Sequence, residues 1–225
     1  MIRAFLDYVT TSENWWGTNG IAHRTTEHLR LSAIALVVAA VIALPPGVVL
    51  GRLRRGGLFV QSVVNIGRAI PSLAVLALLF PLCLRWGFGL GFWPTFVALV
   101  VLGVPPMFTN AYAGIGSVDP AIVDASRGMG MRPLDVLTRV EIPGGLALIL
   151  TGVRIATLQV IATATLGTYV GFNGLGSFIN EGFLQSDDAK LLTGAVAVAL
   201  CALVVDLLFG VAARRAMPWR TKGTQ

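Results

Sequence analysis

The sequence is poor in charge. Charged residues make up 12% of its 225 residues, against about 25% in ordinary soluble domains, while hydrophobic residues reach 55%. A soluble domain of this size could not cover its surface with so few charges. The composition therefore excludes a disordered chain, a coiled coil and a typical cytosolic enzyme, and it predicts an integral membrane protein.

Lysine is almost absent. The two lysines, Lys190 and Lys222, do not follow a glycine-rich turn, and no GxxxxGK[ST] phosphate-binding motif occurs. We therefore expect that the chain does not bind and hydrolyse ATP by itself. No catalytic constellation is visible, so the sequence predicts no enzyme activity and no cofactor bound by this chain.

Cysteine and histidine are equally scarce. Cys83 and Cys201 lie in apolar runs, without CxxC spacing or a nearby histidine, and are expected to be small buried hydrophobic residues rather than metal ligands. His23 and His28 lie near the N-terminus with no nucleophile close in sequence. We expect solvated or interfacial histidines there, and no metal site.

Five apolar segments are long enough to cross a bilayer, whose core requires about 20 apolar residues per helix. They run from about Leu29 to Leu50, Leu58 to Leu84, Phe92 to Ala113, Gly145 to Thr168 and Leu191 to Ala213. The pattern predicts an all-α fold, a polytopic bundle of five transmembrane helices.

The distribution of basic residues predicts the orientation. Ten of the 17 lie after the first, third and fifth spans, five lie on the other side, and two fall inside spans. Because cytoplasmic loops carry an excess of Lys and Arg, the N-terminus is expected outside and the C-terminus inside. Residues 1–28 would form an extracytoplasmic or interfacial segment with Trp15 and Trp16 at headgroup level, residues 29–213 the transmembrane domain, and residues 214–225 a basic cytoplasmic tail. The net charge of +6 then reflects topology, and no nucleic-acid partner is expected.

Three charged residues fall inside the expected spans: Arg68, Arg154 and Asp206. An arginine at the centre of a membrane helix costs about 2.5–3.5 kcal/mol, so these side chains need partners or access to the headgroups. We hypothesise that Arg154 or Arg68 pairs with Asp206. Snorkelling toward the inner headgroups is the alternative.

The fourth span carries a stripe of small and polar residues on one helical face: Gly152, Ala156, Gln159, Thr163 and Gly167. Small residues let membrane helices approach closely, which is the simpler explanation for any one of them. For the stripe as a whole, the pattern favours contact with a partner subunit or with the transport pathway. Prolines within several spans predict kinked or broken helices.

The largest expected cytoplasmic loop covers residues 114–144, called here the 114–144 segment. Asp119 followed by Pro120 is typical of a helix start, and a short helix would run to about Arg127. Glycines 128 and 130 would break it, and Pro133 would begin a second short helix that Pro143 ends. Two short helices with exposed apolar residues predict a knob that fits a groove on a protein partner.

The 114–144 segment resembles the coupling loop of permeases in binding-protein-dependent ABC importers, whose signature is EAA, three residues, Gly, nine residues and then I-x-L-P. The same spacing occurs here at Asp124, Ala125, Ser126, Gly130, Val140, Ile142 and Pro143. Four of these residues are conservative substitutions in the signature: Asp124, Ser126, Val140 and Ile142. The resemblance implies that this loop docks on a separate ATP-binding subunit, which would bind ATP and Mg²⁺.

Four further stretches are similar to the glycine betaine, carnitine and choline permease subfamily: EHLRLS, NIGRAIPSLAVLAL, VDPAIVDASRGMGM and GFNGLG, beginning at residues 27, 65, 118 and 171. The resemblance implies an importer of compatible solutes in a prokaryotic inner or plasma membrane. Its partners would be the ATP-binding subunit, an extracytoplasmic solute-binding protein and a second permease subunit, identical or a sister chain.

Three alternatives stay open from the sequence. One is a membrane-embedded structural subunit with no transport role, which explains the hydrophobicity but not the kinked spans. The same architecture could import another small polar substrate, such as an amino acid or a sulfonate. An ion-driven secondary transporter would use the intramembrane charges. However, the sequence shows no inverted repeat of the kind found in such transporters, and this alternative leaves the 114–144 segment unexplained.

Overall fold

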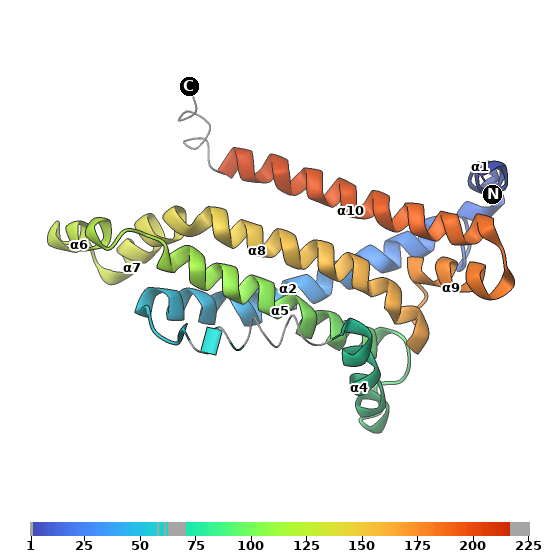
Figure 1. Ribbon diagram of the computed structural model, residues 1–225, viewed down its shortest axis with the longest axis horizontal. Coiled ribbons are helices and arrows are strands. Elements are labelled where there is room, and N and C mark those ends of the chain that lie inside the picture. Colours follow the sequence, from blue (N-terminus) through green and yellow to red (C-terminus); the bar gives the residue numbers. More distant parts are fainter. Residues whose placement is uncertain (1, 58, 61, 63–70, 217–225) are drawn as a thin grey trace. The chain divides into compact units, whose positions relative to one another are not determined.

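The computed structural model describes residues 2–57, 59, 60, 62 and 71–216 (Figure 1). Every regular element among these residues is helical. The elements are α1 (Ile2–Thr10), η1 (Ser12–Trp15), α2 (Ile21–Leu53), α4 (Ser72–Arg85), α5 (Phe92–Gly116), α6 (Pro120–Gly128), α7 (Pro133–Val136), η2 (Leu137–Glu141), α8 (Ile142–Thr163), η3 (Ala164–Val170), α9 (Leu175–Gln185) and α10 (Asp188–Ala216). The all-α prediction is confirmed for the described residues.

Four helical stretches among the described residues are long and apolar enough to cross a membrane: α2, α5, the continuous run Pro133–Val170, and α10. They correspond to the expected first, third, fourth and fifth spans. The expected second span is represented by α4, which has 14 apolar-rich residues and would reach about 21 Å at 1.5 Å per residue. Much of the sequence before α4 lies outside the described residues, so the count of five spans stays a prediction.

Helix α2 begins at Ile21 rather than near Leu29. Hydropathy alone ends the span where polar residues begin. In the fold, however, side chains of these polar residues form hydrogen bonds with the helix backbone. The hydroxyls of Thr25 and Thr26, for example, donate to the carbonyls of Ile21 and Ala22. The helix therefore continues through the polar end without losing hydrogen bonds.

The chain divides into two compact units. The first comprises residues 1–38, 70–102 and 157–206, and the second comprises residues 39–69, 103–156 and 207–225. Each of the four long helical stretches contributes one part of its length to each unit.

Two small apolar cores lie among the described residues of the first unit. One joins α4 and α5 to η3 through Val75, Leu76, Ala98, Leu102 and Val170. The other joins the start of α2 to α9 through Ile21, Leu175 and Phe178, and Cys201 packs at its edge. Cys83 is buried and Cys201 half-buried, both as free thiols, as the sequence predicts.

In the second unit, α2 packs against α5 through a GxxxG pair. A Cβ on Gly47 would lie 2.7 Å from the Phe108 carbonyl oxygen, and one on Gly51 would lie 2.7 Å from the Tyr112 carbonyl oxygen. Glycine lets the two backbones touch, as small residues do in membrane interfaces. This contact brings the end of α2 beside the last turns of α5, from which the 114–144 segment emerges.

The prolines inside α2, α4 and α5 do not end these helices. Of the two expected outcomes, kinked or broken, the helices are therefore not broken at Pro45, Pro46, Pro81, Pro105 and Pro106, and a kink there stays a prediction. Each proline removes one hydrogen bond, and the intact turns on both sides carry the helix through.

Candidate functional site

The 114–144 segment begins with α6, whose start is capped as the sequence predicts. The Asp119 carboxylate accepts a hydrogen bond of 2.8 Å from the Ala121 N–H, and Pro120 occupies the first helical turn. The helix ends at Gly128, and Gly130 has a φ of +85°. Because side chains with a Cβ are strained at such a φ, glycine at position 130 makes the turn between α6 and α7.

The second short helix does not end at Pro143, so that expectation is wrong. Helix α7 runs into the π-helix η2, which runs into α8, and Pro143 is the second residue of α8. The Ile142 N–H bonds to the Leu137 carbonyl, five residues back, as in a π turn. Pro143 has no N–H to donate, so the continuous helical run lacks one hydrogen bond at this position. The segment is therefore joined to α8 without a flexible break.

The segment folds around its own small apolar core. Val118, Val123 and Val136 are buried, with Met131 and Val140 packed against them. Three apolar side chains of the segment are exposed, and we call this set the knob face: Ile122 (54% exposed), Met129 (77%) and Leu134 (72%). Figure 1 shows α6 and α7 together at the ends of α5 and α8.

The residues predicted for coupling divide between the surface and the core of the segment. Asp124, Ala125 and Gly130 are exposed, whereas Ser126 is buried and its hydroxyl donates to the Ile122 carbonyl at 2.7 Å. Val140, Ile142 and Pro143 are half-buried at the junction with α8. The exposed residues are free to meet a partner, and the remaining four support the shape of the segment.

Sequence analysis missed the residues that hold this segment against α2. The Arg52 guanidinium donates to the Pro133 carbonyl at 2.7 Å and lies 3.4 Å from the Glu141 carboxylate. The Arg54 guanidinium donates to the Val118 carbonyl at 2.7 Å. In the sequence both arginines count only among the basic residues that indicate topology, and the acidic Glu141 within an apolar stretch is the available signal.

The predicted stripe on the fourth span is largely buried in the single chain. Gly152, Ala156 and Gly167 are buried, and Gln159 and Thr163 are half-buried. A Cβ on Gly152 would lie 2.7 Å from the Pro106 carbonyl oxygen, and one on Gly167 would lie 2.6 Å from Thr95. These two glycines therefore serve packing within the chain. Gly167 also lies in the 3₁₀-helix η3 rather than in the α-helix.

The intramembrane charges lie on different helices. Arg154 is an exposed residue of α8 and Asp206 a half-buried residue of α10. Arg68 lies outside the described residues. Their pairing stays a prediction.

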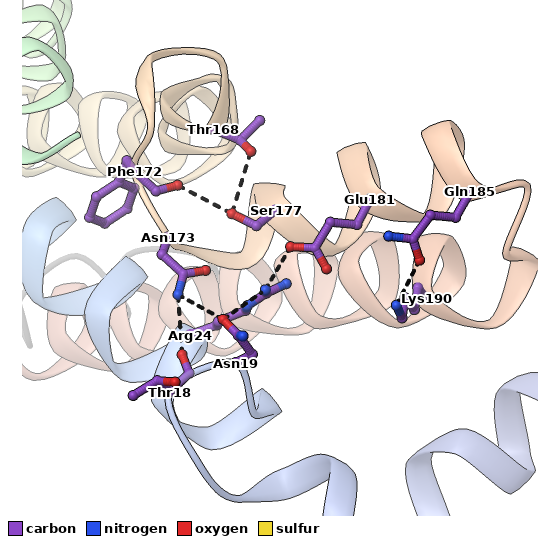
Figure 2. A network of polar contacts seen from close by, with 10 residues as sticks. All are labelled: Thr18, Asn19, Arg24, Thr168, Phe172, Asn173, Ser177, Glu181, Gln185 and Lys190. Atoms are coloured by element: carbon purple, nitrogen blue, oxygen red, sulfur yellow. Dashed lines mark hydrogen bonds and ion pairs between the residues drawn. The ribbon is translucent and has the colours of Figure 1, made fainter. Parts of the chain in front are cut away.

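A second polar cluster, in the first unit, surrounds Arg24 (Figure 2). Only 3% of this side chain is exposed, and it donates to the Glu181 carboxylate at 2.6 Å and to the Asn19 side chain at 3.2 Å. Its guanidinium also lies 4.3 Å from the centre of the Phe178 ring, a cation–π distance. The cluster ties the start of α2 to α9.

The glycine-rich turn before α9 belongs to the same cluster. The Asn173 amide donates to the Thr18 carbonyl and contacts Asn19, and the Ser177 hydroxyl donates to the Phe172 carbonyl (Figure 2). The turn therefore anchors the loop before α2.

His28 is fully buried, so the expectation of a solvated or interfacial histidine is wrong for this residue. Its Nε2 lies 3.0 Å from the Ile161 carbonyl, and because a carbonyl only accepts, Nε2 carries the proton. His23 is exposed.

Tyr8 lies in the field of the Arg24 cluster. Partial burial raises the pKa of the Tyr8 phenol, and the Arg24 charge opposes this shift.

The fold and its apolar helices define a multi-pass membrane protein. Residues 28–218 match the family described as binding-protein-dependent transport system inner membrane component, and the chain belongs to this family.

Characterised relatives are similar over most of the chain. The choline transport system permease protein OpuBB of Bacillus subtilis is 36% identical over 203 residues, covering 89% of this chain and 91% of that protein. The glycine betaine/carnitine/choline transport system permease protein OpuCB of the same organism is 36% identical, covering 92% and 93%. The osmoprotectant import permease protein OsmY of Salmonella typhimurium is 35% identical, covering 85% and 80%.

Solved structures share the fold. An inward-facing structure of the MetNI methionine ABC transporter superimposes with a TM-score of 0.75 at 22% identity, covering 87% of this chain and 95% of that one. An amino acid ABC transporter with histidines superimposes with a TM-score of 0.65 at 20% identity, covering 93% and 95%. The fold resemblance predicted from the 114–144 segment is thereby confirmed.

Proposed function

We propose that this chain is the permease subunit of an ATP-driven importer of compatible solutes, namely glycine betaine, choline, carnitine or proline betaine. The observation that carries the proposal is the 114–144 segment, which folds as a protruding two-helix knob with an apolar outer face. The substrate class is supported by the names of the relatives, which span most of the chain.

The proposed topology has five spans, an external N-terminus and an internal C-terminus in a prokaryotic inner membrane. Residues 1–28 lie at the outer surface, residues 29–213 form the transmembrane domain and residues 214–225 form the cytoplasmic tail. The excess of basic residues beside the 114–144 segment supports a cytoplasmic position for the knob. Helix α1 has no buried residues, and Trp16 is 75% exposed, which suits an interfacial segment.

The knob face would dock into a groove of a separate ATP-binding subunit, with Asp124, Ala125 and Gly130 at the contact. ATP and Mg²⁺ would bind to that subunit and not to this chain. Closure of two ATP-binding subunits would move two knobs, one on each of two permease subunits, and turn the pathway outward. The direct continuity of η2 with α8 would pass this motion into the membrane.

A separate solute-binding protein would deliver the solute at the opposite surface. Helix α9 is a suitable contact because Phe183 and Leu184 at its end are 75% and 72% exposed, while the Arg24 cluster holds its other face. Gln159 and Thr163, the half-buried members of the stripe, are proposed to face the pathway or the second permease subunit.

Co-purification with candidate ATP-binding subunits, followed by reconstitution with the solute-binding protein, tests this proposal. We expect glycine betaine or choline to stimulate ATP hydrolysis and to enter proteoliposomes only when the binding protein and ATP are present. Uptake that continues without any ATP-binding subunit would favour an ion-driven secondary transporter.

A second candidate keeps the architecture and changes the substrate. The fold is shared with amino acid and methionine ABC transporters, so another small polar solute is the alternative. The same assay with an amino acid or a sulfonate distinguishes the two, since stimulation by these solutes alone would contradict the compatible-solute proposal.

A further inference from the structure

The last turn of helix α2 and Arg54, the residue just after the helix, hold the 114–144 segment at three points. The Arg52 guanidinium donates to the Pro133 carbonyl at the start of α7, and its Nε lies 3.4 Å from the Glu141 carboxylate in η2. The Arg54 guanidinium donates to the Val118 carbonyl just before α6. We call Arg52 and Glu141 the clamp, because one arginine bridges the first turn of α7 and the end of η2.

In the clamp Glu141 is buried and Arg52 is half-buried, so the glutamate charge is expensive unless it is paired. The Glu141 side chain is 6% exposed and that of Arg52 is 20% exposed. Within the part of the chain that the structure describes, the Oε2 atom of Glu141 makes no hydrogen bond, so the carboxylate depends on the charge of Arg52. Loss of one partner from such a pair leaves an uncompensated buried charge. A leucine or isoleucine at position 141 would pack without this cost, so stability alone does not account for a glutamate there.

Arginine suits the clamp better than lysine. Its planar fork presents several donors in fixed directions, and here different nitrogens face the Pro133 carbonyl and the Glu141 carboxylate. A lysine has one nitrogen and would satisfy one of these two acceptors well.

The position of the clamp indicates its role. Helices α5 and α8 are joined to the 114–144 segment through the chain itself, whereas α2 is not. The clamp supplies a polar tie between that segment and α2, which packs on α5 through Gly47 and Gly51.

We propose that Arg52 and Glu141 are positioning residues that make α2 move together with the 114–144 segment, so that ATP hydrolysis in the partner is converted into solute movement. This inference rests on the proposed function as an ATP-driven permease. Removing the clamp would leave the knob face in place but loosen α2 from it. Hydrolysis would then continue while fewer solute molecules cross per ATP.

The test is the number of solute molecules imported per ATP hydrolysed, measured in proteoliposomes that contain the complete complex and the binding protein. We expect Arg52→Ala and Glu141→Gln to lower this ratio at least about fivefold, the lower end of typical coupling effects, while co-purification of the ATP-binding subunit is retained. Arg52→Lys should give an intermediate ratio. Arg55→Ala removes an exposed arginine from the same stretch and should keep the wild-type ratio.

The outcomes separate the two proposals. A wild-type complex that imports solute, together with an Arg52→Ala variant of unchanged ratio, would contradict the clamp alone. A variant whose hydrolysis and uptake fall in parallel, with a lowered melting temperature, would show a merely structural role and also overturn it. A wild-type complex without ATP-dependent uptake would contradict the proposed function, and the clamp inference with it.

Discussion

Arg24 is a charged residue in a buried environment. It lies near the start of a membrane helix with 3% of its side chain exposed, and Glu181 supplies the opposite charge at 2.6 Å. Two of its nitrogens make no hydrogen bond among the described residues. The guanidinium therefore depends on Glu181, on Asn19 and on the face of Phe178.

Replacing Glu181 by Gln should destabilise the protein, because Arg24 would keep its charge without its carboxylate. Breaking a buried pair costs about 3–5 kcal/mol, and we expect about 2 kcal/mol here since Glu181 is 34% exposed and water will compensate in part. Thermal unfolding of the purified protein measures the change. Glu27→Gln is the matched control, because it breaks a 3.5 Å pair with Arg30, whose side chain is 67% exposed. Equal melting temperatures for the two variants would disprove the role of the Arg24 cluster.

At the scale of elements, the α6–turn–α7 arrangement follows from a few local signals. Aspartate before proline caps α6, and glycine at a positive φ turns the chain. These interactions lie within a few residues of one another, so they could be predicted from sequence. The π turn into α8 could not, because a proline is compatible both with the end of one helix and with the first turn of another.

The turn between α6 and α7 should be essential for binding the ATP-binding subunit. We expect Gly130→Asp to leave the protein in the membrane but to abolish co-purification of that subunit, since a side chain at φ +85° costs about 1–2 kcal/mol and would distort the knob face. Gly128→Asp places the same charge on a nearby exposed residue, whose Cβ would meet open space. The Gly128→Asp variant should bind the ATP-binding subunit at least about tenfold more tightly than the Gly130→Asp variant, a difference of about 1.4 kcal/mol in binding free energy. Normal co-purification of Gly130→Asp would contradict the assignment of this segment.

At the scale of the whole molecule, the intramembrane charges make a further prediction. If Arg154 pairs with Asp206, then Arg154→Asp and Asp206→Arg should each lower the yield of folded protein, and the double variant should recover most of it. Membrane yield and solute uptake measure this. The control combines Arg154→Asp with Asp188→Arg, which makes the same charge change at an exposed position of α10. The yield of folded protein should not recover in this control. Failure of the first double variant as well would favour snorkelling over pairing.

The membrane class, four long apolar spans and the first helix of the 114–144 segment were determined by the sequence itself. These features depend on hydropathy and on signals that act within one or two helical turns. The partners of Arg24, His28, Arg52 and Glu141 were decided by tertiary structure. Each of them bonds to a residue more than 80 positions away, and no local pattern records which distant carbonyl or carboxylate a buried polar group will meet.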